Sequence, residues 1–253
     1  MQSLGKIASL LQTKVGDLLP RNKLARGVSV LSGGNAIGQI ITVLAAPLLT
    51  RLYTPGEFGV AALYISITLV LGVVLSLKYE VAIALPESDK EALVLVKLCL
   101  CIVVLMAVIF TCITLIYKDS VAALFKTPEL ANHLLFLPIS VLLLGSFDVF
   151  KSWCIRKREF VSVGKARVSQ VVSSVLVQLA GAPLGSISLI LGQLANQGAG
   201  SIRLGKITLG QSKFENYPLS DLWRLLVRYK KFPLVTTWAL LLNRVGHLSL
   251  IHI

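Results

Sequence analysis

The chain has 253 residues, of which 55% are hydrophobic and 15% are charged, and its mean hydropathy is +0.79. A soluble domain carries about 25% charged residues, so this composition excludes an ordinary soluble enzyme and indicates an all-helical integral protein of an inner membrane. The net charge of +13 does not indicate a nucleic-acid partner, because membrane proteins collect Lys and Arg in their cytoplasmic loops.

Residues 1–27 precede the first long apolar stretch. Apolar side chains recur at helical spacing between Leu4 and Leu18, and Pro20 follows them. This pattern predicts an amphipathic helix on the inner membrane surface. A disordered tail is the alternative.

Six stretches are long and apolar enough to cross a hydrocarbon core of about 30 Å, which takes roughly 20 helical residues. A turn at Gly181–Gly185 separates the last two, because Pro183 would break a single long helix. A seventh span begins near Pro233. The six complete spans are predicted at 28–50, 58–77, 93–117, 131–150, 168–184 and 186–202.

Lys and Arg are distributed unevenly between the two sides of these spans. With the N-terminus in the cytoplasm, the inside segments carry 21 Lys and Arg and the outside loops carry 3. Cytoplasmic loops are enriched in these residues. We therefore expect a multi-pass protein of the bacterial inner membrane with a cytoplasmic N-terminus.

Three helix starts carry capping sequences. Thr54–Glu57 and Ser88–Glu91 have the pattern of a capping box, and Thr127-Pro128-Glu129 opens the fourth span in a similar way. Such caps satisfy the free N–H groups at the point where the chain enters lipid.

Two basic segments follow the fourth and sixth spans. Residues 151–167 are predicted to extend the fourth helix into the cytoplasm, with Trp153 at the membrane interface. Residues 203–232 are predicted to be a cytoplasmic connector, in which Ser220 caps a short amphipathic helix. This connector indicates a boundary between the six-helix lobe 28–202 and a second half.

The C-terminal end departs from this pattern. Residues 233–247 are expected to begin the seventh span. The last six residues, 248–253, can be read from a transposon-end adapter used in sequencing libraries and are expected to be foreign. The sequence is therefore interpreted as the N-terminal fragment of a larger protein.

The first span contains polar side chains that are costly in lipid and should face a bundle interior or a water-filled cavity. Asn35, Gln39 and Thr42 share one face of the helix, and Gly34 and Gly38 form a GxxxG motif that favours close helix approach. We expect this face to line a substrate cavity, with interhelical hydrogen bonding as the alternative.

A second polar stripe is predicted on the sixth span. It is expected to line the same cavity, together with one residue of the fifth span. Its members are Gln193, Asn196, Gln197 and Ser201, with Gln178 from the fifth span.

Charged residues lie close to three span ends. Asp148 is expected to pair with Lys151 three residues on. A proton or sodium coupling site is the alternative, for which Glu80 is the second candidate. Arg51 is expected to anchor the first span at the outer face or to contact an anionic head group, since a guanidinium binds phosphate in a bidentate way.

No catalytic constellation accompanies these residues. The chain has no P-loop, no nucleophile elbow and no zinc motif, and its four cysteines lack metal spacing. We therefore expect no enzymatic activity, no cofactor and no metal.

Three patches resemble one family of transporters. Residues 49–59 (LTRLYTPGEFG), 79–86 (YEVAIALP) and 228–233 (RYKKFP) are similar to patterns of the polysaccharide-repeat-unit flippases for O-antigen and capsule, within the multidrug/oligosaccharidyl-lipid/polysaccharide exporter superfamily. The resemblance extends over about residues 25–243.

This resemblance implies a protein of twelve to fourteen helices in two lobes, which flips undecaprenyl-diphosphate-linked oligosaccharide across the inner membrane by alternating access. Polysaccharide polymerase or glycosyltransferases are the protein partners that it implies. A drug/cation antiporter of the same superfamily and a non-transporting membrane scaffold are the alternatives. The antiporter requires acidic residues deep in the cavity, and the scaffold requires few polar stripes.

Overall fold

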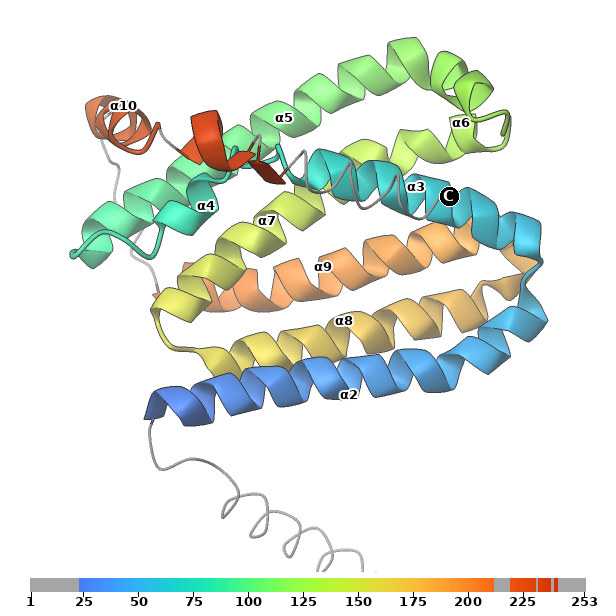
Figure 1. Ribbon diagram of the computed structural model, residues 1–253, viewed down its shortest axis with the longest axis horizontal. Coiled ribbons are helices and arrows are strands. Elements are labelled where there is room, and N and C mark those ends of the chain that lie inside the picture. The colour runs from blue at the N-terminus through green and yellow to red at the C-terminus, as the bar shows by residue number, and fades with distance from the viewer. Residues whose placement is uncertain (1–22, 212–218, 231, 238, 241–253) are drawn as a thin grey trace, which may run out of the picture.

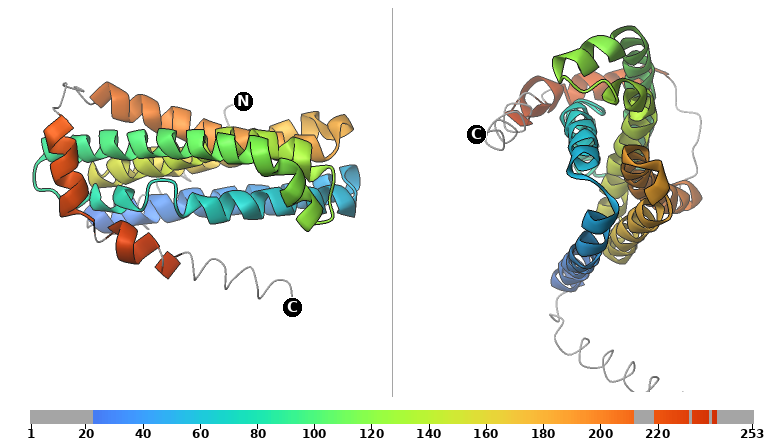
Figure 2. Two further views of the ribbon diagram at one scale, coloured as in Figure 1. Left: turned by 90° about the horizontal axis from the view of Figure 1, so that it is seen from above. Right: turned by 90° about the vertical axis from the view of Figure 1, so that its right-hand side faces the viewer.

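A computed structural model describes residues 23–211, 219–230, 232–237 and 239–240. This part of the chain is helical and contains no strand. Figure 1 shows the long helices lying side by side, and Figure 2 shows α10 crossing one end of them. The long helices are α2 (Lys23–Leu52), α3 (Pro55–Gly72), α5 (Asp89–Leu124), α7 (Leu137–Arg156), α8 (Phe160–Ala180) and α9 (Ser186–Gln211). The short elements are α4 (Tyr79–Ala82), α6 (Leu130–His133), η1 (Leu134–Phe136), η2 (Ala182–Leu184), α10 (Leu219–Arg228) and the π-helical turn η3 (Phe232–Thr236).

Five helical segments in the described part of the chain are long and apolar enough to cross a membrane. They correspond to the first five predicted spans. The sixth predicted span also forms a helix, α9, which packs between α7 and α8. It does not reach the hydropathy of the other five, because Gln193, Asn196 and Gln197 lie within it. Five of the six predicted spans are therefore supported as helices that could cross a membrane. The amphipathic helix predicted in residues 1–19, most of the seventh span and the tail 248–253 lie outside the described residues.

Several predicted boundaries were wrong. The second span was predicted to reach residue 77, but α3 ends at Gly72 and turns follow it. The fourth helix continues only to Arg156, and α8 already begins at Phe160. Residues 203–211 continue α9, so the predicted connector begins in helix. The predicted turn between the fifth and sixth spans was correct, with η2 between α8 and α9.

The capping predictions were partly correct. Thr54 forms a complete capping box with Glu57, and the Ser88 side chain accepts a hydrogen bond from the Glu91 backbone N–H. Thr127 does not cap a helix, because its hydroxyl donates to the Phe125 carbonyl and α6 begins only at Leu130. The α10 helix already includes Leu219, so Ser220 lies inside the helix and not at the N-cap position before it.

The α8 helix lies between α2 and α9 and packs extensively against both. Gly34 allows the α2 contact, because a Cβ added there would lie 2.7 Å from the Gly164 Cα atom. Gly38 approaches the Val171 side chain one turn further along. The predicted GxxxG motif therefore mediates close helix packing.

The largest buried side chain, Trp153, is 1% exposed and packs in the core between α4, α5 and α7. It does not lie at the interface as predicted, because α5 and α10 cover this end of α7. The indole Nε1 atom has no hydrogen-bond partner in the described residues.

We predict that Gly34→Ala lowers the free energy of unfolding by about 1–3 kcal/mol, because the added methyl group collides with the α8 backbone. Gly33→Ala is the matched control, since nothing lies within 4 Å of its added Cβ, and it should be neutral or stabilise the helix by up to about 1 kcal/mol. Unfolding in detergent micelles, followed by circular dichroism, measures both. Equal effects of the two substitutions would contradict the close contact.

Candidate functional site

The chain leaves helical geometry between α3 and α4, inside the bundle. Residues 73–78 form turns, and Leu75 and Ser76 within them are buried. Leu77 and Lys78 have positive φ angles of 49° and 60°. A side chain in this left-handed region costs of order 1–3 kcal/mol, and such strain is found mostly at functional sites and switches.

A buried ion pair lies at this break. The Lys78 Nζ atom is 3.1 Å from Glu80 Oε1, and the Ser76 hydroxyl donates to Glu80 Oε2. Glu80 is 5% exposed. A buried carboxylate is tolerated when charge and hydrogen-bond partners surround it, as they do here.

A second ion pair lies nearby on α7. The Lys151 Nζ atom is 2.5 Å from Asp148 Oδ1, which confirms the predicted pair. Lys151 also lies over the Phe147 ring, 5.3 Å from its centroid. Asp148 and Lys78 line one pocket of about 240 Å³, together with Leu69, Gly72, Val73, Leu144 and Leu240.

The two candidates for ion coupling, Glu80 and Asp148, are therefore near the same pocket although 68 positions separate them in the sequence. Each carboxylate is paired with a lysine. A small cation entering the pocket would have to compete with these ammonium groups. A proton or an anion could instead separate either pair.

The predicted polar face of α2 does not point into the bundle interior. Asn35, Gln39 and Thr42 are exposed, and the Thr42 hydroxyl donates to the Gly38 carbonyl at 3.0 Å. Arg51, in the last turn of α2, is also exposed. The interior of the α2–α8 contact is instead made by glycines, because only they let the two backbones meet.

The predicted stripe on α9 divides between two neighbours. Ser201 donates to the Leu143 carbonyl at 2.6 Å, so this face contacts α7. Gln197, one turn away, is 3% exposed, and neither polar atom of its amide has a hydrogen-bond partner among the residues described. Gln193 and Asn196 are half-buried, and Gln178 lies against Gly192.

Sequence reasoning missed Arg167, which it placed in the cytoplasmic extension of the fourth helix. The structure places it within α8, where its Cγ atom lies 3.8 Å from a Cβ added at Gly38. Its Nη1 atom donates to Gln170 Oε1 at 3.5 Å, and it forms no ion pair within the described part of the chain. Apolar residues at helical spacing on both sides, such as Val163 and Val171, are the signal that would have revealed this helix.

One end of the bundle is held by Arg156 at the end of α7. Its guanidinium donates to the carbonyls of Ile83 at 3.2 Å and Pro86 at 2.7 Å, and it pairs with Asp89 at 3.1 Å. These contacts fix the loop between α4 and α5. We call this the Arg156 end.

The connector helix α10 also packs at the Arg156 end. Arg228 pairs with Glu91 at 2.7 Å, and the Tyr79 hydroxyl donates to the Leu226 carbonyl at 3.0 Å. Burial raises the pKa of Tyr79, so the hydroxyl remains a donor. The patches 79–86 and 228–233, far apart in the sequence, thus lie in one cluster.

The opposite end of the bundle holds the patch 49–59, and we call it the Tyr53 end. The Tyr53 hydroxyl donates to the Gln178 carbonyl and lies 3.0 Å from Ser188 Oγ. Gly185 has a φ of +63°, and a Cβ there would lie 2.6 Å from a Glu57 carboxylate oxygen. Gly185 therefore permits the α8–α9 turn to pass next to α3.

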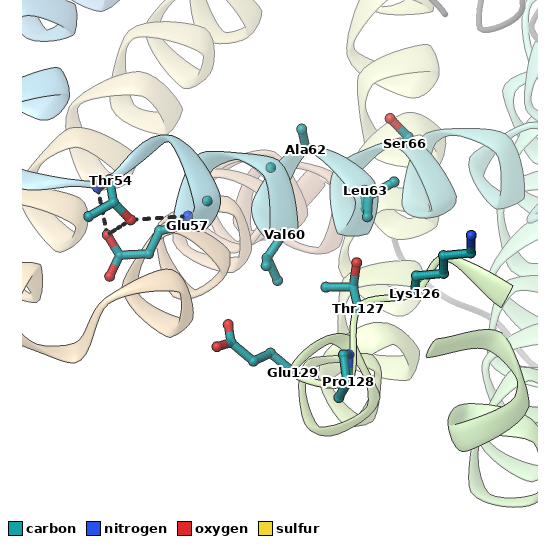
Figure 3. Close-up of a pocket in the computed structure, with 12 residues that line it drawn as sticks. Thr54, Glu57, Val60, Ala62, Leu63, Ser66, Lys126, Thr127, Pro128 and Glu129 are labelled. Atoms are coloured by element: carbon teal, nitrogen blue, oxygen red, sulfur yellow. Dashed lines mark hydrogen bonds between the residues drawn. The ribbon is translucent and has the colours of Figure 1, made fainter. Parts of the chain in front are cut away.

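Figure 3 shows a pocket of about 730 Å³ at this Tyr53 end, between the first turns of α3 and the loop 126–129. Glu57 and Glu129 contribute to its walls from opposite elements, as do Lys126 and Ser66. None of the sequence-predicted candidates lines it. No three His, Cys, Asp or Glu side chains of the described ranges are grouped so that they could hold a metal ion.

Five apolar helices in a bundle, with charges paired inside it, define a multi-pass membrane protein. A family model described as polysaccharide biosynthesis protein matches residues 48–206, which is more than half of the chain. The chain belongs to this family. No curated protein and no solved structure matches it.

We predict that Glu80→Gln lowers the free energy of unfolding by about 3–5 kcal/mol, because it leaves the Lys78 ammonium buried without its counter-charge. Glu87→Gln, which changes an exposed carboxylate of the same segment, should change it by less than about 0.5 kcal/mol.

The double variant Lys78→Met with Glu80→Gln should recover part of the loss, because no unpaired charge remains. Unfolding in micelles measures these three variants together with the single variant Lys78→Met. If the double variant were as unstable as the sum of its two single substitutions, the pair would not be the cause.

Proposed function

We propose that this chain forms the N-terminal lobe of a transporter that flips undecaprenyl-diphosphate-linked oligosaccharide repeat units across the inner membrane. A role in surface polysaccharide biosynthesis follows from the family. The flipping step is the further proposal. The observation that carries it is an exposed cation, Arg167, which contacts α2 at Gly38 and forms no ion pair among the described residues.

The chemistry of the substrate supports this proposal. A diphosphate and hydrated sugars cannot enter hydrocarbon without replacement of their hydrogen bonds with water. Arg167 can bind phosphate oxygens, since a guanidinium matches phosphate in a bidentate way. Asn35 and Gln39 are exposed on the neighbouring helix and carry amides that suit sugar hydroxyls. A second lobe facing them would close the path.

The orientation belongs to the same proposal. The Arg156 end gathers the loops that were counted as cytoplasmic, and the Tyr53 end gathers loops with few cations. We place the Arg156 end in the cytoplasm, because the Lys and Arg count favours it by 21 to 3. Residues 1–27 and the connector then lie on the cytoplasmic side.

The drug/cation antiporter is less well supported. It needs acidic side chains available to a cation, whereas Glu80 and Asp148 are each paired with a lysine. A non-transporting scaffold for a polymerase or glycosyltransferase gives no reason for Arg167, which has no ion pair in the described ranges, or for the buried Gln197 amide. The following experiment distinguishes both of these alternatives from flipping.

The test uses the complete gene that encodes this chain, in a strain of the same organism whose repeat-unit translocase is deleted. We expect surface polysaccharide to return, and repeat units to become accessible to a membrane-impermeant lectin on spheroplasts. If properly inserted protein restores neither signal, flipping is wrong. Polysaccharide without lectin-accessible repeat units would favour the scaffold, and raised tolerance to cationic drugs without polysaccharide would favour the antiporter.

We predict that Arg167→Gln lowers the rate of lectin exposure at least about tenfold, because a charge-assisted bond to phosphate is lost. Arg167→Lys should fall between this variant and the wild type, since it keeps the charge and loses the bidentate geometry. Arg158→Gln, an exposed cation at the Arg156 end, is the control and should keep the full rate. Membrane levels of each protein are measured by immunoblot, so that loss of rate is separated from loss of insertion.

A further inference from the structure

A pocket of about 490 Å³ lies between α8 and α9, on a part of the bundle that the proposed transport path does not use. Its lining combines two cations, one hydroxyl and an apolar wall. The residues are Ser169 from α8 and Ala199, Ile202, Arg203, Lys206 and Ile207 from α9.

The cations of this pocket have no counter-charge among the residues that the structure describes. Arg203 and Lys206 are exposed and form no ion pair within the described ranges. Lys165 precedes Ser169 by one helical turn and so lies on the same face of α8. Neither α8 nor α9 contains Asp or Glu. Within the described ranges, the side chains around the pocket therefore carry a net positive charge.

Arg203 and Lys206 closely follow residue 202, where the predicted sixth span ends. With the orientation proposed above, this places the pocket near the cytoplasmic head-group region. Lys and Arg side chains at such a depth extend toward the membrane surface while their stems stay in the apolar region. Exposed Lys and Arg side chains near a membrane surface attract anionic lipid head groups.

We propose that this pocket binds one anionic phospholipid, whose phosphate diester pairs with Arg203 and Lys206. The Ser169 hydroxyl donates a hydrogen bond to the same phosphate, and the acyl chains lie along Ala199 and Ile202, which is 60% exposed. Basic pockets between transmembrane helices are suited to such head groups. The site is separate from Arg167, which lies on the α2 side of α8.

The test uses the purified full chain in dodecylmaltoside micelles, with bound lipid counted by native mass spectrometry. The probes are phosphatidylglycerol, phosphatidylcholine with the same acyl chains, and glycerol 3-phosphate. We expect phosphatidylglycerol to bind at least about tenfold more tightly than phosphatidylcholine, and glycerol 3-phosphate not to displace it at equal concentration.

The variant Arg203→Gln with Lys206→Gln should weaken phosphatidylglycerol binding about 30-fold and leave phosphatidylcholine binding unchanged. The matched control is Lys90→Gln with Arg158→Gln, which removes two exposed cations at the same end but outside the pocket. It should bind as the wild type does. Circular dichroism confirms that each variant is folded.

Three results would overturn the proposal. Equal weakening in both double variants would mean that net charge alone attracts the lipid. Equal binding of the two phospholipids would remove the role of the charge, and displacement by glycerol 3-phosphate would mean that a free phosphate is the ligand. Because lipid binding is measured without transport, failure of the flipping proposal would leave this result unaffected.

Discussion

A bundle of apolar helices must satisfy every charge and every non-helical backbone group within itself, and the rest of this structure depends on that constraint. The chain breaks its helix between α3 and α4, and Lys78 and Glu80 neutralise each other at the break. Arg156 satisfies the carbonyls of the loop that follows. Without these contacts the break would leave buried charges and backbone carbonyls unpaired, which costs about 1–3 kcal/mol or more for each group.

The same constraint organises the two ends. At the Arg156 end, α10 is held to α5 by Arg228 and to α4 by the Tyr79 hydroxyl. A movement of the connector would therefore displace Tyr79 and, with it, the strained residue Lys78, which precedes Tyr79 in the chain. At the Tyr53 end, one hydroxyl links the start of α3 to α8 and α9. Both ends are thus joined to the central helices by few, directional bonds.

The positions of the glycines determine which helix faces pack closely and where the neighbouring polar side chains lie. Because Gly34 and Gly38 bring α2 against α8, Asn35 and Gln39 are displaced to the exposed side of the contact. Gly200 similarly leaves room for the Gln170 amide, and Gly192 for Gln178. Small residues therefore make space for long polar side chains inside the bundle. The buried Gln197 amide differs from these, since it has no hydrogen-bond partner among the described residues.

The sequence by itself determined the membrane class, five of the spans, the GxxxG contact and the Asp148–Lys151 pair, because these depend on local composition and on spacing within one helix. Only the tertiary structure decided that Lys78 and Asp148 share a pocket and that Arg167 lies beside α2. It also decided that Trp153 is buried and that Asn35 is exposed. The reason is physical: periodicity fixes the face on which a side chain lies, but the packing of neighbouring helices decides what covers that face.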